Sequence, residues 1–223
     1  CEDKVKPYMT LTNQEYDNDF YRASYIPTSL SYVEVYNVKS INFGAFDQCT
    51  MIDVIELPKT NTSYEYELES IDDYAFRNTG LTKIFLPNSL NSIGEGSFRD
   101  NAKLRSVIFK DGIGIEFINN YAFANNPKLV MNYLPDSVTE IGNYAFYANT
   151  SMTEFRVSEN VHTIGYAAFG LCTSLVELAI PFVGAHEYTD NYTVLIDEAT
   201  RVLLDKEDTV FGYIFGTDGN ELT

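Results

Sequence analysis

Apolar residues recur in sets of three along this chain, and the last two members of each set are alternate residues. Alternation with a period of two is typical of a β-strand that buries one face. A proline often follows a set and would end the strand, because it cannot donate a hydrogen bond to a neighbouring strand. The pattern therefore predicts one short strand for each set. The sets are Ile52, Ile55 and Leu57; Leu81, Ile84 and Leu86; Leu104, Val107 and Phe109; Met152, Phe155 and Val157; Leu175, Leu178 and Ile180.

Pairs of a small residue and a phenylalanine alternate with these sets at a near-constant interval. Successive phenylalanines of the pairs are separated by 30, 22, 25, 23 and 23 residues. Self-similarity at such a period indicates a repeat protein, in which no unit buries its apolar edge alone and neighbours must stack. We therefore expect an elongated solenoid with the phenyl rings and aliphatic side chains inside. The phenylalanines are Phe46, Phe76, Phe98, Phe123, Phe146 and Phe169.

Three further features of the repeat concern its turns and one departure from its core pattern. A Cys or Asn follows each phenylalanine by two or three residues, where a small or polar side chain can satisfy backbone groups inside the coil. A glycine follows the Ile of several copies, as in Ile141-Gly142, and suits a turn that needs positive φ. Asn132 stands where a core Ile belongs, which predicts a hydrogen-bonded Asn or a local shift. The turn residues are Cys49, Asn78, Asn101, Asn126, Asn149 and Cys172.

The repeated unit, best formed over residues 134–146, resembles the BspA-like leucine-rich repeat of bacterial surface proteins. The resemblance covers roughly residues 41–181, with a weaker copy over 18–27. It implies a leucine-rich-repeat solenoid of the α/β horseshoe type. Such a fold is dominated by strands, which form a parallel β-sheet stacked coil by coil, with short helical or irregular turns on the other side.

The chain divides into three regions on these patterns. Residues 1–27 form an N-terminal lead-in or cap that includes the degenerate repeat, and residues 28–181 form the leucine-rich repeats. Residues 182–223 depart from the repeat and resemble an insert found within some BspA-like chains. Two apolar runs in this insert, 193–196 and 201–204, predict a β-hairpin. The end of the chain then reads as the start of a further, truncated repeat.

Net charge limits the partners that this chain can bind. The formal charge is −17 at pH 7, which repels phosphate backbones and anionic membrane surfaces. No apolar run approaches the ~20 residues of a membrane helix. The chain opens on Cys1 followed by polar residues, which looks like a bacterial lipoprotein after removal of its signal peptide. The expected location is then the cell surface, with lipid on Cys1; the alternative is that Cys1 marks only where the given sequence starts.

Residues for catalysis or metal binding do not gather in the sequence. His162 and His186 have no Cys, Asp or His partner at metal-ligand spacing. Cys49 and Cys172 occupy the same repeat position five coils apart, ~24 Å at ~4.8 Å per strand, so we expect two buried thiols and no disulfide. No nucleotide or hydrolase motif is present. We therefore expect no enzyme activity, no cofactor and no metal site.

The outward positions of the predicted strands supply a candidate binding surface. Three successive coils place Phe85, Ile108 and Tyr133 side by side on the sheet face, an apolar stripe that the repeat itself does not cover. Two alternatives remain: the long Tyr-rich loops cover the stripe, or the residues reflect ordinary β-propensity. The candidate binding residues also include Met131, Lys83 and Arg156.

The resemblance and the absent catalytic set favour an interaction protein. BspA-like proteins are associated with adhesion, which implies a scaffold that binds an extracellular protein of a host or neighbouring cell through the sheet face. The alternative is a glycan-binding surface lipoprotein, because exposed Tyr and Phe rings stack on sugars. An enzyme that uses His162 or the acidic clusters is the least supported class.

Overall fold

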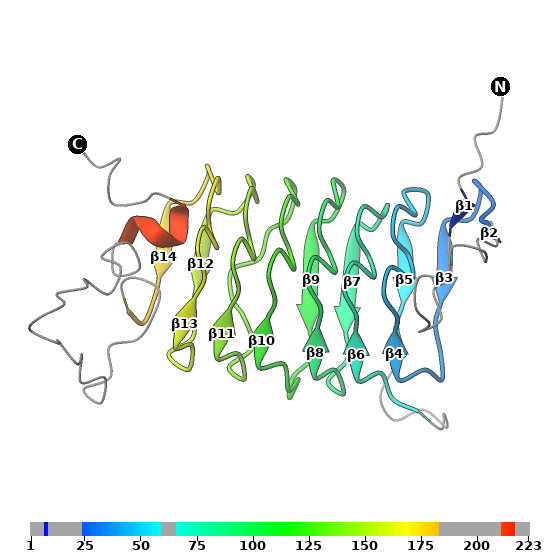
Figure 1. Ribbon diagram of the computed structural model, residues 1–223, viewed down its shortest axis with the longest axis horizontal. Helices are drawn as coiled ribbons and strands as arrows, with labels where there is room; N and C mark the ends of the chain where they lie inside the picture. Colours follow the sequence, from blue (N-terminus) through cyan, green and yellow to red (C-terminus); the bar gives the residue numbers. More distant parts are fainter. Residues whose placement is uncertain (1–6, 9–23, 59–65, 183–210, 217–223) are drawn as a thin grey trace, which may run out of the picture.

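The described residues of the computed structural model are 7–8, 24–58, 66–182 and 211–216. They wind into a row of similar coils stacked along one axis, with β3 near one end and β14 near the other (Figure 1). Each coil is short and exposes its edges, so burial comes from the coils on either side of it. The predicted solenoid is confirmed.

The longer strands form pairs along one side of the stack. All these pairs are parallel, and Tyr133 adds an isolated parallel bridge to Arg156. The alternating apolar residues of the sequence point inward from these strands, as in β7, where Ile84 and Leu86 are buried and Phe85 is exposed. The pairs are β3 (Tyr32–Glu34) with β5 (Val54–Glu56), β7 (Lys83–Leu86) with β9 (Ser106–Phe109), and β12 (Glu154–Arg156) with β14 (Glu177–Ala179).

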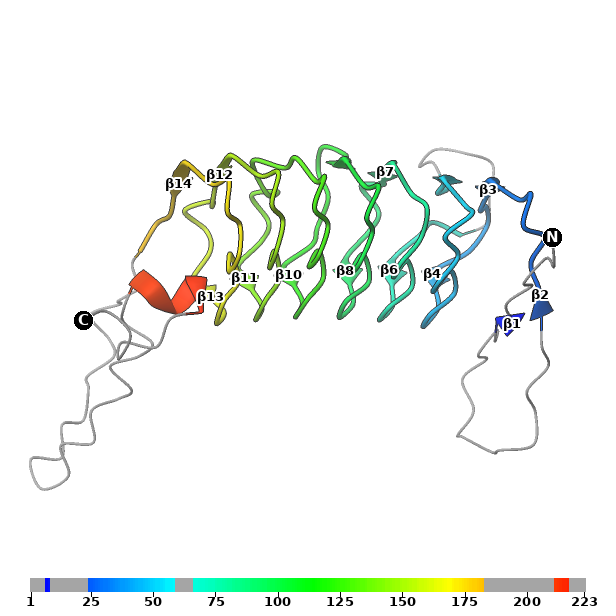
Figure 2. The same cartoon turned by 90° about the horizontal axis from the view of Figure 1, so that it is seen from above.

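A second parallel sheet covers the opposite side of the stack, where the sequence predicted helical or irregular turns. Figure 2 shows the two sets of strands on opposite sides of the coils. Each coil contributes one strand of two residues, and its second residue is a buried isoleucine. The strands, in spatial order, are β13 (Thr163–Ile164), β11 (Glu140–Ile141), β10 (Phe117–Ile118), β8 (Ser92–Ile93), β6 (Ser70–Ile71) and β4 (Ser40–Ile41).

The two ends of the described chain differ from the coils. At the N-terminal end β1 (Pro7–Tyr8) pairs with β2 (Ser24–Tyr25) in antiparallel fashion. At the other end the 3₁₀ helix η1 (Phe211–Phe215) lies against the last coil. The amide of Phe169 donates to the Ile214 carbonyl at 2.8 Å, as each earlier phenylalanine of the repeat donates to the following coil. The predicted hairpin at 193–204, Cys1 and His186 lie outside the described residues.

The six phenylalanines of the repeat form one continuous column inside the stack. Neighbouring rings lie 5.2–5.7 Å apart between centroids, with interplanar angles of 6–17°. Five of the six are fully buried; Phe46, in the first coil, is half-buried because only one neighbour covers it. The column confirms the predicted interior.

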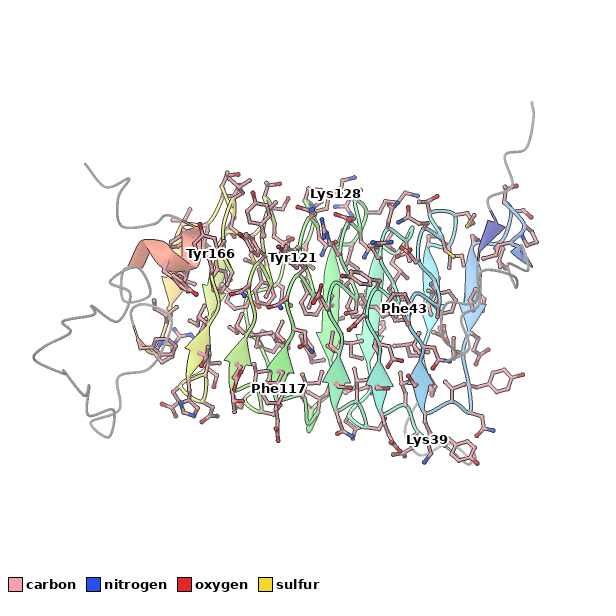
Figure 3. The ribbon with its side chains drawn as sticks, viewed as in Figure 1. Lys39, Phe43, Phe117, Tyr121, Lys128 and Tyr166 are labelled. Carbon is pink, nitrogen blue, oxygen red and sulfur yellow. The ribbon has the colours of Figure 1, made fainter. Side chains whose placement is uncertain are left out.

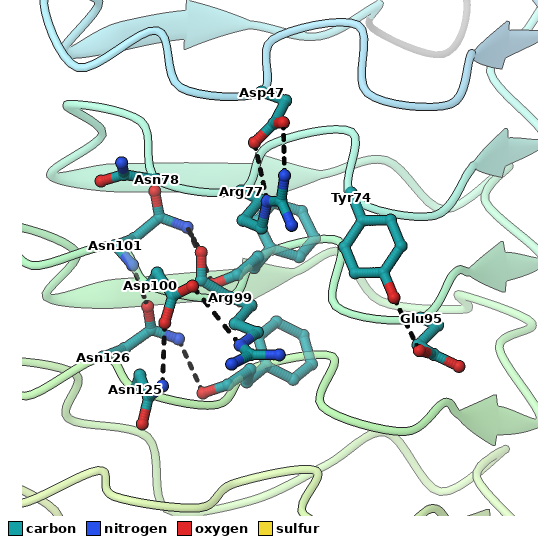
Figure 4. Close-up of polar contacts among 12 residues, drawn as sticks. Asp47, Tyr74, Arg77, Asn78, Glu95, Arg99, Asp100, Asn101, Asn125 and Asn126 are labelled. Atoms are coloured by element: carbon teal, nitrogen blue, oxygen red, sulfur yellow. Dashed lines mark hydrogen bonds and ion pairs between the residues drawn. The ribbon is translucent and has the colours of Figure 1, made fainter.

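A chain of polar side chains runs beside this column and satisfies backbone groups that the coils leave unpaired. The Asn126 side-chain oxygen accepts from the Asn101 amide at 2.8 Å, and its nitrogen donates to the Phe123 carbonyl at 2.7 Å. Figure 4 shows Asn101 next to Asn126. The Asn101 side-chain oxygen in turn accepts from the Thr79 amide of the preceding coil at 2.7 Å. Thr79 is the buried member of that coil and not Asn78 as predicted. The turn position lies three residues after every phenylalanine.

The glycines that follow the repeat isoleucines have a different role from the one predicted. Gly94, Gly142 and Gly165 are not among the residues with positive φ. The neighbouring coil passes too close for a side chain: a Cβ on Gly142 would lie 2.7 Å from the Asn120 amide nitrogen, and one on Gly94 would lie 2.5 Å from that of Asp73. The repeat therefore requires glycine there for close approach of two backbones.

Positive φ occurs instead at two other positions of each coil, on either side of the phenylalanine. The first precedes the Ala-Phe or Ser-Phe pair, and the second follows the phenylalanine by two residues. Most of these residues carry a Cβ, so each turn costs about 1 kcal/mol in backbone strain, which the stacked interior must offset. The first set is Gly44, Tyr74, Gly96, Tyr121, Tyr144 and Ala167; the second is Gln48, Asn78, Asp100, Asn125, Ala148 and Leu171.

Candidate docking surface

The outward residues of the longer strands, together with Tyr133, form a surface that we call the strand face. Phe85 in β7 lies opposite Ile108 in β9, and Tyr133 lies opposite Arg156 in β12. Phe85 is 52% exposed and Tyr133 is 55% exposed, whereas Ile108 is partly buried between its neighbours. The two rings are open to solvent, so the stripe is not covered by the loops.

Two cations flank this apolar stripe. The Lys83 ammonium lies 4.4 Å from the centroid of the Phe85 ring, close enough for a cation–π interaction. Arg156 is exposed beside Tyr133. Both cations therefore lie next to an exposed ring, and a partner that covers the ring also meets the charge.

Met131 does not belong to the strand face, and the prediction that it lies outward is wrong. Its side chain is buried, and Asn132 is exposed and donates to a Glu154 side-chain oxygen at 3.2 Å. Burial of Asn132 at the expected core position would leave its amide without partners, so the chain shifts by one residue and Met131 fills the interior. Val130 takes the outward position instead and is 60% exposed.

The C-terminal part of the strand face is hollowed. A shallow depression of about 240 Å³ lies over β12 and β14 and reaches the Tyr133 bridge. Its walls combine an aromatic ring, a guanidinium group and two carboxylates, so it offers apolar contact and charges of both signs. The lining residues are Asn132, Tyr133, Glu154, Phe155, Arg156, Glu177 and Ala179.

A second aromatic surface, which the sequence analysis did not single out, follows the phenylalanine turns; we call it the tyrosine ridge. The Tyr121 and Tyr144 rings stack at 4.9 Å, and Tyr166 meets Tyr144 edge-on at 5.6 Å. Figure 3 shows Tyr121 and Tyr166 near the middle of the stack, away from Phe117, which lies lower on the six-stranded sheet. The position before Ala-Phe is tyrosine in three copies, a signal that the sequence did contain. These rings mainly pack on each other.

Polar contacts of the tyrosine ridge also link successive coils. The Tyr74 hydroxyl donates to a Glu95 carboxylate oxygen at 2.7 Å, and this hydrogen bond is the main cause of a raised Tyr74 pKa (Figure 4). Arg77 forms a two-point ion pair with Asp47, at 2.8 and 2.6 Å, and its guanidinium lies 4.9 Å from the Tyr74 ring. Such contacts fix the register of the coils and leave little side-chain hydrogen-bonding capacity for a ligand.

The candidate reactive groups do not assemble into a catalytic site in the described part of the chain. Cys49 and Cys172 are free and buried, as predicted, and burial raises the pKa of each thiol to about 11. The thiolate is the nucleophilic form, so both groups are poor nucleophiles near neutral pH. His162 is exposed. Within residues 7–8, 24–58, 66–182 and 211–216, no three His, Cys, Asp or Glu side chains converge to hold a metal ion.

The fold defines a leucine-rich-repeat solenoid built almost entirely from short parallel strands and turns. A family model for the BspA type leucine rich repeat region matches six copies over residues 18–68 and 69–190. The chain belongs to this family. No helix of the described residues is long and apolar enough to cross a membrane.

Solved structures with similar folds come from several bacteria. The pneumococcal vaccine antigen PcpA has a TM-score of 0.46 at 21% identity, over 74% of this chain and 54% of its own. The Treponema pallidum (T. pallidum) leucine-rich-repeat protein scores 0.43 at 29% identity, over 68% and 57%. A leucine-rich cell surface protein of Faecalibacterium prausnitzii scores 0.35 at 18% identity, over 67% and 59%. The match therefore spans little more than half of each of these chains. A search of curated proteins gave no match.

Proposed function

We propose that this protein is a non-enzymatic interaction scaffold on the bacterial cell surface, which binds an extracellular protein through the strand face. The resemblance of the repeat to that of bacterial surface proteins supports this location, and a lipid on Cys1 would provide the anchor. The stacked interior makes the scaffold rigid, so that the outward residues are held in place before a partner arrives. Preorganisation of this kind lowers the entropic cost of binding.

The observation that carries the proposal is the exposure of Phe85 and Tyr133 on the strand face, on either side of the coil that holds Ile108. Aromatic residues are enriched among the residues that dominate binding energy at protein interfaces. Each ring here has a cation beside it, Lys83 or Arg156, and the C-terminal hollow adjoins Tyr133. An exposed apolar surface bordered by charged groups is the arrangement expected of a protein-binding site.

The proposal is tested with the double variant Phe85→Ala/Tyr133→Ala and a panel of purified host extracellular-matrix proteins. Binding of the wild-type chain to a panel member should fall at least about tenfold in the variant, because each buried aromatic anchor contributes about 2 kcal/mol or more. Phe117→Ala is the matched control, since Phe117 is 46% exposed on the opposite sheet. Its binding should equal that of the wild type.

A glycan array run beside the panel tests the alternative function. The wild-type chain could bind a glycan and no matrix protein, and the double variant could lose that glycan binding. This result would show that the ligand of the strand face is a sugar. Equal loss of binding in Phe117→Ala and in the double variant would show that the strand face is not the site. Thermal unfolding of each variant separates loss of the site from loss of the fold.

A further inference from the structure

The lysines and arginines of this acidic chain are distributed unevenly. The described residues include nine of them, and three form ion pairs: Lys39 with Glu69, Arg77 with Asp47 and Arg99 with Asp100. The other six are exposed and have no carboxylate partner among the described residues, although Asp and Glu total 32 in the whole chain. These six are Lys83, Lys103, Arg105, Lys110, Lys128 and Arg156.

Five of the six unpaired cations belong to three successive coils, and we call them the basic band. The Arg105 amide donates to the Thr82 carbonyl at 2.8 Å, and the Arg105 carbonyl accepts from the Val130 amide at 2.9 Å. The Lys110 amide donates to Leu86 at 3.1 Å, so the band spans both ends of β9. Figure 3 places Lys128 at one edge of the stack and the ion-paired Lys39 at the other. The basic band is Lys83, Lys103, Arg105, Lys110 and Lys128.

On the strand face, carboxylates lie on the strands that flank β7 and β9; beside the band itself, the exposed Asp111 follows Lys110. Glu34 and Glu56 lie on β3 and β5, and Glu154 and Glu177 lie on β12 and β14. The strands between them, β7 and β9, contain no acidic residue. Along the stack, the strand face therefore passes from the acidic β3 and β5 to β7 and β9, which carry Lys83 and no carboxylate, and then to β12 and β14, where Glu154 and Glu177 accompany Arg156. The exposed Phe85 ring lies inside the basic part.

We propose that the protein ligand of the strand face docks through a short segment that combines acidic and apolar side chains. The inference rests on the proposed function and names the chemistry of the partner. Complementary charge accelerates encounter and suppresses wrong partners. The apolar side chains of the segment would cover Phe85 and Ile108, and its carboxylates would meet the ammonium and guanidinium groups around them.

The shape of the charge distribution favours a short acidic protein segment over a long polyanion. A long sulfated or uronic polysaccharide would extend beyond the three basic coils and meet the carboxylates on either side of them. The whole chain, with its charge of −17, would also repel it. An acidic segment confined to the width of β7 and β9 avoids this repulsion. Aliphatic Ile108 in the centre of the stripe further suits an apolar side chain, because sugar rings stack on aromatic ones.

The test uses three synthetic peptides of equal length, with alternating Glu-Tyr, Glu-Ser and Lys-Tyr sequences, and a heparin oligosaccharide, all titrated into the full chain at physiological salt. We expect the Glu-Tyr peptide to bind most tightly and the Lys-Tyr peptide not to bind. Lys83→Glu and Arg105→Glu should each weaken the Glu-Tyr complex about tenfold. Lys39→Glu is the matched control, because it changes the net charge equally on the opposite sheet.

Each other outcome overturns the inference. Heparin binding that Lys83→Glu removes, without peptide binding, would assign the band to an anionic glycan. Equal weakening by Lys39→Glu would show an effect of net charge alone. If Phe85→Ala/Tyr133→Ala abolishes binding of a matrix protein and Lys83→Glu and Arg105→Glu do not change it, the docking function stands and the acidic segment is wrong. Far-ultraviolet circular dichroism confirms that each variant keeps the fold.

Discussion

The interior column and the strand face are built on the same repeat and obey different rules. In the column, each of the six coils places a phenylalanine at the same position, and the rings stack at nearly constant distances. On the strand face, equivalent positions hold Glu56, Phe85, Ile108, Tyr133 and Arg156 in turn. Stacking constrains the interior residues because each ring packs directly against the ring of the next coil. Solvent does not constrain the residues of the strand face, so residues specific to a partner can accumulate there.

The chain of polar side chains beside the phenylalanine column shows how strongly each coil constrains the next. Its members Thr79, Asn101, Asn126 and Asn149 are buried, and each later residue serves a backbone amide of the coil before it. A buried amide without a partner costs about 1–3 kcal/mol, so each coil depends on the identity of its neighbour. On the strand face, exposed polar groups such as those of Asn132 and Glu154 can bond to water as well as to each other, so they depend less on the neighbouring coil. We therefore expect stability and the proposed binding to depend on different side chains.

The largest expected effect comes from breaking the interior column. Phe123→Ala removes a fully buried ring between Phe98 and Phe146 and should lower the free energy of unfolding by about 3–5 kcal/mol. Phe85→Ala, the same substitution at an exposed ring, should change it by less than about 0.5 kcal/mol. Urea denaturation followed by circular dichroism measures both. Similar losses in the two variants would show that the strand face is part of the core.

The close approach of neighbouring coils gives an intermediate effect. Gly142→Ala places a Cβ 2.7 Å from a backbone nitrogen, which cannot move aside alone, so we expect a loss of about 1–3 kcal/mol. Gly114→Ala is the control, because its Cβ would meet only the end of the Asn91 side chain at 3.2 Å. That variant should unfold within about 0.5 kcal/mol of the wild type. A neutral Gly142→Ala would mean that the coils can separate at this point without cost.

Positions at which the same residue type recurs in every repeat could be predicted from the sequence. The interior was predicted best because most of its positions are of this kind. The phenylalanine spacing and the alternating pairs define the core faces without reference to a partner. The six-stranded sheet was missed because each coil contributes only two residues, such as Ser92 and Ile93, and two residues show no alternation. The repeat was predicted to need glycine at position 142, but the reason given, a positive φ, was wrong. Glycine is needed because two backbones approach closely, which the sequence of a single repeat does not reveal.

The strand face was predicted less well because it depends on local register. Counting forward from Leu129 places Met131 outward, yet Asn132 resists burial and the shifted chain turns Met131 inward. Phe85 and Tyr133, on either side of the coil with Ile108, kept their predicted exposure. The basic band was missed because two of the three ion pairs form between coils, and the sequence alone does not tell which lysines lack a carboxylate. Only the fold separates Lys39, paired with Glu69, from Lys83.

The smallest expected effect comes from titrating the thiol of one interior residue, Cys172. Burial raises the pKa of the Cys172 thiol from 9.0 to about 11, so the folded chain disfavours the thiolate. The stability that depends on the neutral thiol is complete below the unfolded pKa and is lost as the pH rises from about 9 to about 11. The wild type loses this stabilisation at high pH and Cys172→Ala does not. The difference in free energy of unfolding between the two should therefore be about 1 kcal/mol smaller at pH 10 than at pH 7. A difference that stays constant between these two pH values would show that the thiol is not sealed inside the stack, and that the interior opens at its C-terminal end.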